Sequence, residues 1–116
     1  MSMSTQPKVL LIESDEKAAE GLCFAAEGFF DMAVECSAEQ AVNRIGFEDF
    51  DLVVLDAQLD NLLITTKVIE SFRRLHIPFM LLGKKLPGMN GYPVLSKRDG
   101  KYFVDKVSGL LGLVRT

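Results

Sequence analysis

Polar side chains follow the short apolar runs of this sequence. Glu13, Ser14 and Asp15 follow the first run, Asp56 ends another, and Lys97 follows the last. Crowded carboxylates bind a hard cation such as Mg²⁺, which prefers oxygen ligands and keeps several waters. One carboxylate can attack phosphorus and form an aspartyl phosphate, while the cation and an ammonium group share the charge of the transition state. This chemistry requires a fold that brings residues from distant parts of the chain together.

Solid apolar runs alternate with helical patterns along the whole chain. Unbroken apolar runs are typical of strands buried on both faces, and we expect strands at 8–12, 32–35, 51–56, 77–82 and 94–96. Apolar residues at helical spacing predict helices after Ser14 or Asp15, from Ser37 to Gly46, over 61–76 and over 100–114. The segment 83–93 is rich in Gly and Pro, so a long helix is not expected there.

Strands of this kind joined by helices predict a doubly wound α/β domain with a parallel sheet. In such sheets the reactive site lies beyond the carboxyl ends of the strands. The residues that follow the predicted strands are therefore expected to meet at one edge of the sheet, with the acids near Asp56 and Lys97 opposite them.

Length and composition limit the possible classes of protein. The chain has 116 residues, 48% hydrophobic and 25% charged, which predicts one globular domain, with 1–7 a disordered N-terminus and 8–116 the domain. No apolar stretch is long enough for a membrane span, and residues 1–7 lack the apolar core of a signal peptide, so we expect a cytoplasmic protein. One His and two isolated Cys do not make a zinc site, and we interpret both Cys as reduced thiols.

Charge is divided unevenly between the two halves of the chain. Residues 1–60 hold 3 Lys/Arg and 13 Asp/Glu, a net charge of −10, whereas residues 61–116 hold 10 Lys/Arg and 3 Asp/Glu, a net charge of +7. In one sheet this becomes a dipole across the domain, and partners of the basic side are expected to carry acidic patches. The basic cluster of Lys97, Arg98, Lys101 and Lys106 has no aromatic interleaving, so nucleic-acid binding is not expected.

Four segments carry a family resemblance. KVLLIESDE at 8–16, DLVVLD at 51–56, IPFMLLG at 77–83 and PVLSK at 93–97 resemble the receiver domain of two-component response regulators, over the whole chain after residue 7. The resemblance implies a flavodoxin-like fold with strand order 2-1-3-4-5 and a fourth helix that is short or absent. It implies Asp56 as the phosphoacceptor, Glu13, Asp56 and the Gln58 backbone carbonyl as Mg²⁺ ligands, and Lys97 as the partner of the phosphoryl group.

The resemblance also implies partners and a role. Such a single-domain receiver would take its phosphoryl group from a histidine kinase or a phosphotransfer protein, and it would be no enzyme beyond Mg²⁺-dependent self-phosphorylation and dephosphorylation at Asp56. No output domain fits in the remaining length, so output would come from protein contact, or the chain is a piece of a longer protein. Apolar residues of the last helix, Leu110, Leu111, Leu113 and Val114, make a homodimer through that helix an additional expectation.

The sequence departs from the family at six positions, and two of them, Asp60 and Ile64, stand where the family usually has Pro and Gly after the acceptor. The second of the two adjacent acids is Ser14, with Asp15 one residue late, and the phosphate-sensing hydroxyl is replaced by Gly83. The switching aromatic is Val94, and the Pro after the lysine is Arg98. These departures leave a second interpretation open, a degenerate receiver that acts as an interaction module without phosphorylation. Asp15 is then a helix cap rather than a metal ligand, and Lys97 only neutralises buried acids.

Three other candidates have plainer interpretations. His76 lies between a predicted helix and a predicted strand, which favours a boundary residue over a phosphodonor. Lys84 and Lys85 follow Gly83 without the G-x-x-x-x-G-K-[ST] pattern of a phosphate loop.

Overall fold

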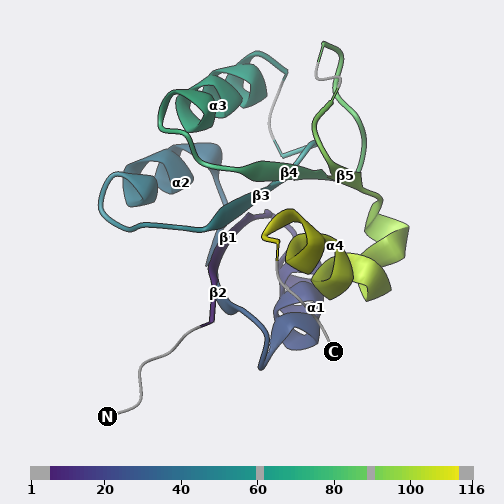
Figure 1. Cartoon of the computed structure of the whole chain (residues 1–116). Coiled ribbons are helices and arrows are strands. Elements are labelled where there is room, and N and C mark those ends of the chain that lie inside the picture. The colour runs from purple at the N-terminus through teal and green to yellow at the C-terminus, as the bar shows by residue number, and fades with distance from the viewer. Residues whose placement is uncertain (1–5, 60–61, 89–90, 113–116) are drawn as a thin grey trace.

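A computed structural model describes residues 6–59, 62–88 and 91–112 of the chain (Figure 1). The elements, in chain order, are β1 Lys8–Ile12, α1 Glu16–Ala26, β2 Asp31–Glu35, α2 Ala38–Ile45, β3 Leu52–Asp56, α3 Leu62–Arg74, β4 Phe79–Leu82, β5 Val94–Leu95, the 3-10 helix η1 Lys97–Tyr102 and α4 Phe103–Leu110. No helix of the described residues is long and apolar enough to cross a membrane.

The five strands form one parallel sheet in the order β2-β1-β3-β4-β5. This confirms the predicted fold class and strand order. The pairing of Ile12 with Leu55, and of Asp56 with Leu82, brings the carboxyl ends of β1, β3 and β4 into line. The residues that follow these strands therefore meet at the same edge.

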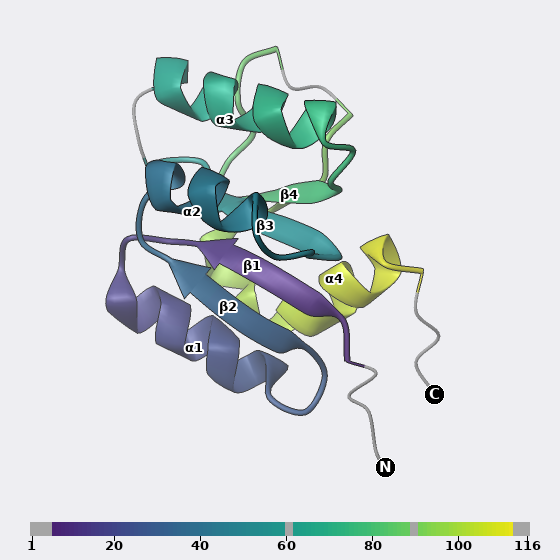
Figure 2. The ribbon, with the colours of Figure 1, turned by 90° about the vertical axis from the view of Figure 1, so that its left-hand side faces the viewer.

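Each face of the sheet is covered by a separate apolar core, and Figure 2 shows α2 and α3 on one face and α1 and α4 on the other. Successive residues of a strand point to opposite faces, so an unbroken apolar strand serves both cores. Leu10 and Val53 pack under α2 and α3, whereas Leu11 and Val54 pack under α1 and α4. This explains why β1, β3 and β4 lack polar alternation, whereas β2, at the edge of the sheet, is more exposed.

Between β4 and β5 the described residues contain no helix, as the Gly and Pro content predicted. Leu86 is buried in the core under α3, and Tyr92 stacks on Phe79 with ring centroids 4.6 Å apart. Single side chains of this segment, rather than one face of a helix, therefore pack against the core. Residues 89 and 90, within this segment, lie outside the described part of the chain.

The chain after β5 differs from the prediction. One helix was expected over 100–114, but η1 already begins at Lys97, and α4 ends at Leu110. Asp99 has non-helical backbone angles inside η1, and Gly112 adopts a left-handed conformation with φ of +70°, which stops the helix. Leu113 and Val114, part of the expected dimer helix, lie outside the described residues, as does most of the segment expected to be disordered, 1–5. The dimer remains a prediction.

Candidate functional site

Asp56 is the last residue of β3, a strand whose residues are all buried, and it is itself only 3% exposed. The chain turns immediately after it, and the backbone N–H of Gln58 donates a hydrogen bond of 3.0 Å to Asp56 Oδ1. This bond orients the carboxylate, whose other oxygen, Oδ2, accepts a hydrogen bond of 3.0 Å from Lys97 Nζ. Gln58, expected to offer its backbone carbonyl to a cation, therefore lies directly beside the proposed acceptor.

Glu13 follows β1 and is 2% exposed, which is unusual for a carboxylate. Its Oε2 accepts a hydrogen bond of 3.2 Å from the Asp15 N–H. Burial raises the pKa of Glu13, and the adjacent Asp56 carboxylate raises it further. The two acids predicted to share a site are therefore neighbours, and the charge of Asp56 disfavours the ionisation of Glu13.

Lys97, the first residue of η1, reaches both acids. Its Nζ lies 3.0 Å from Asp56 Oδ2 and 3.2 Å from Glu13 Oε1. Burial alone would lower the pKa of Lys97, but its interactions with Asp56 and Glu13 outweigh burial and raise it. The ammonium group therefore stays charged and partly neutralises two carboxylates that come from different strands.

The fit of this site to Mg²⁺ depends on one oxygen atom. Glu13 Oε1 is buried and has no hydrogen-bond partner among the described residues, because Lys97 Nζ approaches it as an ion pair without hydrogen-bond alignment. A buried oxygen left in this state fits a cation ligand. Glu13, Asp56 and the Gln58 carbonyl are the candidate donors, and Mg²⁺ commonly uses only one or two carboxylates together with waters.

Asp15 does not join these donors in the structure. It is the N-cap of α1, where its Oδ1 accepts hydrogen bonds of 3.0 Å from the Lys17 N–H and 3.3 Å from the Ala18 N–H. Within the described part of the chain, no three His, Cys, Asp or Glu side chains gather as a metal cluster. Of the two roles left open by the sequence, the structure places Asp15 as the helix cap.

Gly83 follows β4 and lies beside the carboxylate. A Cβ atom built on it would be 3.8 Å from Asp56 Oδ1 and 3.6 Å from Lys97 Cε, both ordinary contacts. Its φ of +110° is a conformation that L side chains rarely adopt. Position 83 therefore lacks a hydroxyl and also has a backbone conformation that favours glycine. The space beside Asp56 would still admit a Cβ atom.

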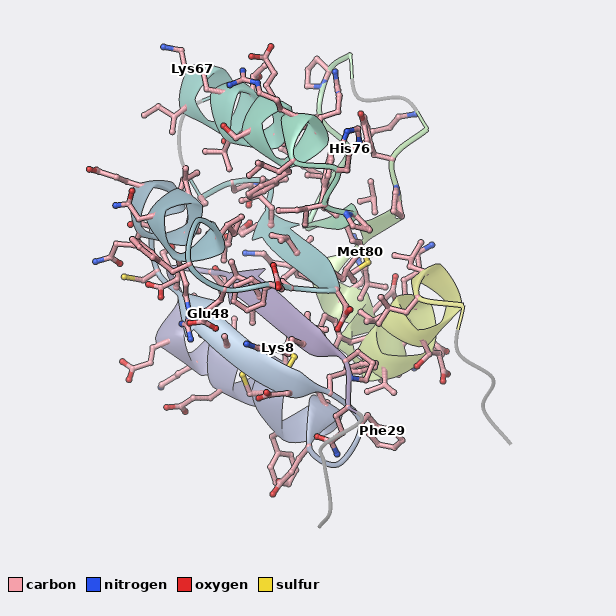
Figure 3. The ribbon with its side chains drawn as sticks, turned by 60° about the vertical axis from the view of Figure 1, so that its left-hand side comes forward. Lys8, Phe29, Glu48, Lys67, His76 and Met80 are labelled. Atoms are coloured by element: carbon pink, nitrogen blue, oxygen red, sulfur yellow. The ribbon has the colours of Figure 1, made fainter. Side chains whose placement is uncertain are left out.

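The remaining candidates lie away from these residues. His76 is exposed just after α3, where it takes a left-handed conformation with φ of +58° (Figure 3). Lys84 and Lys85 are exposed in the segment after β4. Cys23 and Cys36 are free thiols, as predicted, and burial raises the pKa of Cys23.

Sequence reasoning missed a cleft beside the site. A cavity of about 330 Å³ between α1 and η1 is lined by Leu22 and Leu82 together with Glu13 and Lys97 of the site. Lys17, Lys101, Gly21 and Gly100 also line this cavity. The two glycines have no side chain and therefore leave space in it. The sequence signal for this cavity was the pair of glycines, one in α1 and one in η1. That they line the same cavity depends on how the two helices pack, which the sequence alone does not reveal.

Comparisons with known proteins support the fold. No protein-family model and no curated protein match the sequence. Among solved structures, the chain is similar to the BeF3-activated conformation of SdrG from Pseudomonas melonis, with 24% identity over 94% of this chain and 98% of that one and a TM-score of 0.73. It is also similar to the receiver domain of the Francisella response regulator 1452, with 22% identity, coverage of 92% and 98% and a TM-score of 0.73.

A third similar structure is the N-terminal domain of a response regulator/sensory box/GGDEF 3-domain protein from Carboxydothermus hydrogenoformans. It shares 16% identity, with coverage of 90% of this chain and 94% of that chain and a TM-score of 0.76. Identities this low establish the architecture and leave the chemistry of individual residues to be argued from the site itself.

Proposed function

With the fold of response regulator receivers as the premise, we propose that this chain accepts a phosphoryl group on Asp56 in two-component or phosphorelay signalling. The observation that carries the proposal is the convergence of Asp56, Glu13 and Lys97 from three strand ends, with Nζ 3.0 Å and 3.2 Å from the two carboxylates. The donor would be a histidine kinase, a phosphotransfer protein or a small phosphodonor. Self-phosphorylation and dephosphorylation are the only reactions we propose.

In the proposed reaction an Asp56 carboxylate oxygen attacks phosphorus, the bond between phosphorus and the donor atom breaks, and the donor leaves with its electron pair. The Gln58 N–H holds the carboxylate in place, and Lys97 offers positive charge to the phosphoryl oxygens. Glu13, Asp56 and the Gln58 carbonyl would hold Mg²⁺, which supplies further charge neutralisation when bound. Later attack of water on phosphorus returns Asp56 and releases inorganic phosphate.

The test is phosphoryl transfer from acetyl phosphate in the presence of Mg²⁺, followed by intact mass spectrometry. We expect a mass gain of one phosphoryl group that is stable in acid, labile in base and absent from Asp56→Asn. Asp49→Asn, which removes an exposed carboxylate elsewhere, is the matched control and keeps the gain. No mass gain in the wild-type chain, together with no Mg²⁺ binding at about millimolar concentration, would contradict the proposal.

A second candidate function is favoured by one specific observation. Lys97 already contacts both acids, and Gly83 offers no hydroxyl to a phosphoryl group. In a degenerate receiver that binds partners without phosphorylation, Lys97 would only neutralise the two buried acids, and no hydroxyl would be required at position 83. The same experiment separates the two, because this candidate predicts no mass gain with acetyl phosphate.

A further inference from the structure

The division of charge between the two halves is not used by the site around Asp56. Part of the acidic half is neutralised internally: Glu48 pairs with Lys8 at 3.1 Å and with Arg44 at 2.9 Å, and Arg44 also reaches Glu35 (Figure 3). The carboxylates of Glu20 and Glu27, in contrast, make no hydrogen bond or ion pair within the described residues. The exposed surface of α1 and its C-cap thus carries negative charge that no ion pair among the described residues neutralises.

An exposed aromatic side chain stands between these two carboxylates. Phe24 is 77% exposed on α1. Glu20 precedes it by four residues on the same face of α1, and Glu27, the C-cap residue, follows it by three, just beyond the end of the helix. The acidic half therefore presents an apolar knob flanked by free negative charge.

The basic half has a pocket with the opposite character. A cavity of about 450 Å³ opens between the end of α3, the start of β4, the residues before β5 and the end of α4. Its apolar lining consists of Leu52, Ile77, Pro78, Phe79, Tyr92, Pro93 and Leu110. Arg73 and His76 also line it, and Figure 3 places His76 at the end of α3.

The two cationic or titratable side chains of this pocket have no acidic partner among the described residues. The Arg73 guanidinium lies 5.4 Å from the Tyr92 ring centroid, which holds it over the aromatic surface without neutralising it. His76 is exposed and makes no ion pair in the same part of the chain. The pocket is therefore complementary to an apolar group that carries negative charge at its sides.

We propose that the occupant is a second copy of this chain, with Phe24 of one copy in the pocket of the next and Glu20 and Glu27 facing Arg73. Both halves of the contact exist on one chain, and the charge dipole orients approaching copies head to tail. Because the knob and the pocket are different patches, the contact is heterologous and generates rings or open chains of copies. This association does not depend on phosphorylation.

The first test is sedimentation velocity of the whole chain over a concentration series up to about 1 mM, in low and high salt. We expect the average mass to rise with concentration and the association to weaken in high salt. Phe24→Ala and Arg73→Glu should each weaken association about tenfold or more. Phe47→Ala, which removes a 91% exposed aromatic beside the neutralised Glu48, and Arg74→Glu are the matched controls and leave it unchanged.

The second test mixes the two defective variants. Phe24→Ala keeps its pocket and Arg73→Glu keeps its Phe24, so the mixture should form a heterodimer of one copy each with the wild-type affinity, although each variant alone associates about tenfold or more weakly. Arg73→Gln replaces Arg73→Glu if the charge reversal prevents folding. A wild-type chain that stays monomeric over the whole range, equal effects of Phe24→Ala and Phe47→Ala, or no heterodimer in the mixture would overturn the proposal. Monomers that bind an acidic aromatic peptide would assign the pocket to another protein.

Discussion

The carboxyl edge of the sheet has charged side chains at the ends of β1 and β3 but only a glycine at the end of β4. At the ends of β1 and β3, Glu13 and Asp56 are buried acids in register, with the Lys97 ammonium against both. At the end of β4, Gly83 stands where a receiver would place a hydroxyl, and the segment that follows has no helix among its described residues. The side chains that the proposed phosphoryl transfer uses thus meet at one end of the edge, whereas at the other end a glycine takes the position of the hydroxyl that the resemblance implies.

This difference has an energetic consequence. Phosphorylation can shift a two-state equilibrium only by its differential interaction with the two states. Without a side-chain donor at position 83, much of that differential interaction is lost. We therefore expect phosphorylation of Asp56, if accepted, to be weakly coupled to any rearrangement of the β4–β5 segment, and the predictions below test each side separately.

The largest expected effect concerns Leu86, which anchors the β4–β5 segment. This side chain is 5% exposed and packs in the core under α3. Leu86→Ala should lower the free energy of unfolding by about 2–5 kcal/mol through lost burial and a residual cavity. Urea unfolding measures the loss, and Leu75→Ala, at a 56% exposed leucine, is the control with about 0.5 kcal/mol or less. Equal effects would mean that the segment is not part of the core.

The next effect concerns the glycine beside the acceptor. Gly83→Ala should cost about 1–2 kcal/mol of stability, because its φ of +110° disfavours any side chain, although the space for a Cβ exists. Gly83→Ser has the same backbone strain and adds a hydroxyl near Asp56. Chemical-shift changes on acetyl phosphate treatment should spread into β4–β5 in Gly83→Ser and stay local in Gly83→Ala. Identical spectra of the two variants would show that the missing hydroxyl does not account for the difference between the two sides.

The contrast between these positions also explains what the sequence could reveal. Unbroken apolar runs such as 52–55 predicted strands, and strands predicted the edge where Asp56 and Lys97 meet, because both inferences depend only on local pattern and parallel topology. The meaning of Gly83 could not be predicted, because a missing side chain does not disclose a positive φ. The 3-10 helix η1, which begins at Lys97, was missed for a similar reason. Its backbone is irregular at Asp99, and the spacing of apolar residues does not indicate such backbone angles.

A smaller effect should follow removal of the α1 cap. Asp15→Ala loses the hydrogen bonds from Lys17 and Ala18 and should lower stability by about 1 kcal/mol. Because Asp15 faces the helix rather than the cation donors, Mg²⁺ affinity by titration calorimetry should stay near the wild-type value. Asp15→Ser, which keeps a capping oxygen, should recover most of the stability. A large loss of Mg²⁺ affinity in both variants would instead make Asp15 a ligand and bring the site closer to the usual pair of acids.

The smallest expected effect, and the one most specific to the proposed acceptor side, is that of Glu13→Gln. The pKa of Glu13 in the folded chain is raised above its ordinary value of 4.5, chiefly by burial, so the folded state holds this proton more tightly than the unfolded state does. The contribution of Glu13 to stability is therefore fully present below about pH 4.5 and is lost as the pH rises through the raised pKa. Glutamine does not titrate, so the variant should gain stability relative to wild type as the pH rises.

Urea unfolding at a series of pH values, first without and then with Mg²⁺, measures this gain. Exposed Glu20→Gln removes the same charge and controls for overall electrostatics. Mg²⁺ should reduce the difference between wild type and Glu13→Gln at neutral pH, because a cation on Oε1 of Glu13, which accepts no hydrogen bond among the described residues, favours the ionised carboxylate. A difference that is independent of both pH and Mg²⁺ would mean that Lys97 alone satisfies this carboxylate. Glu13 and Lys97 would then leave no role for a cation at this site. The interpretation as an interaction module without phosphorylation would replace the proposal of a phosphoacceptor.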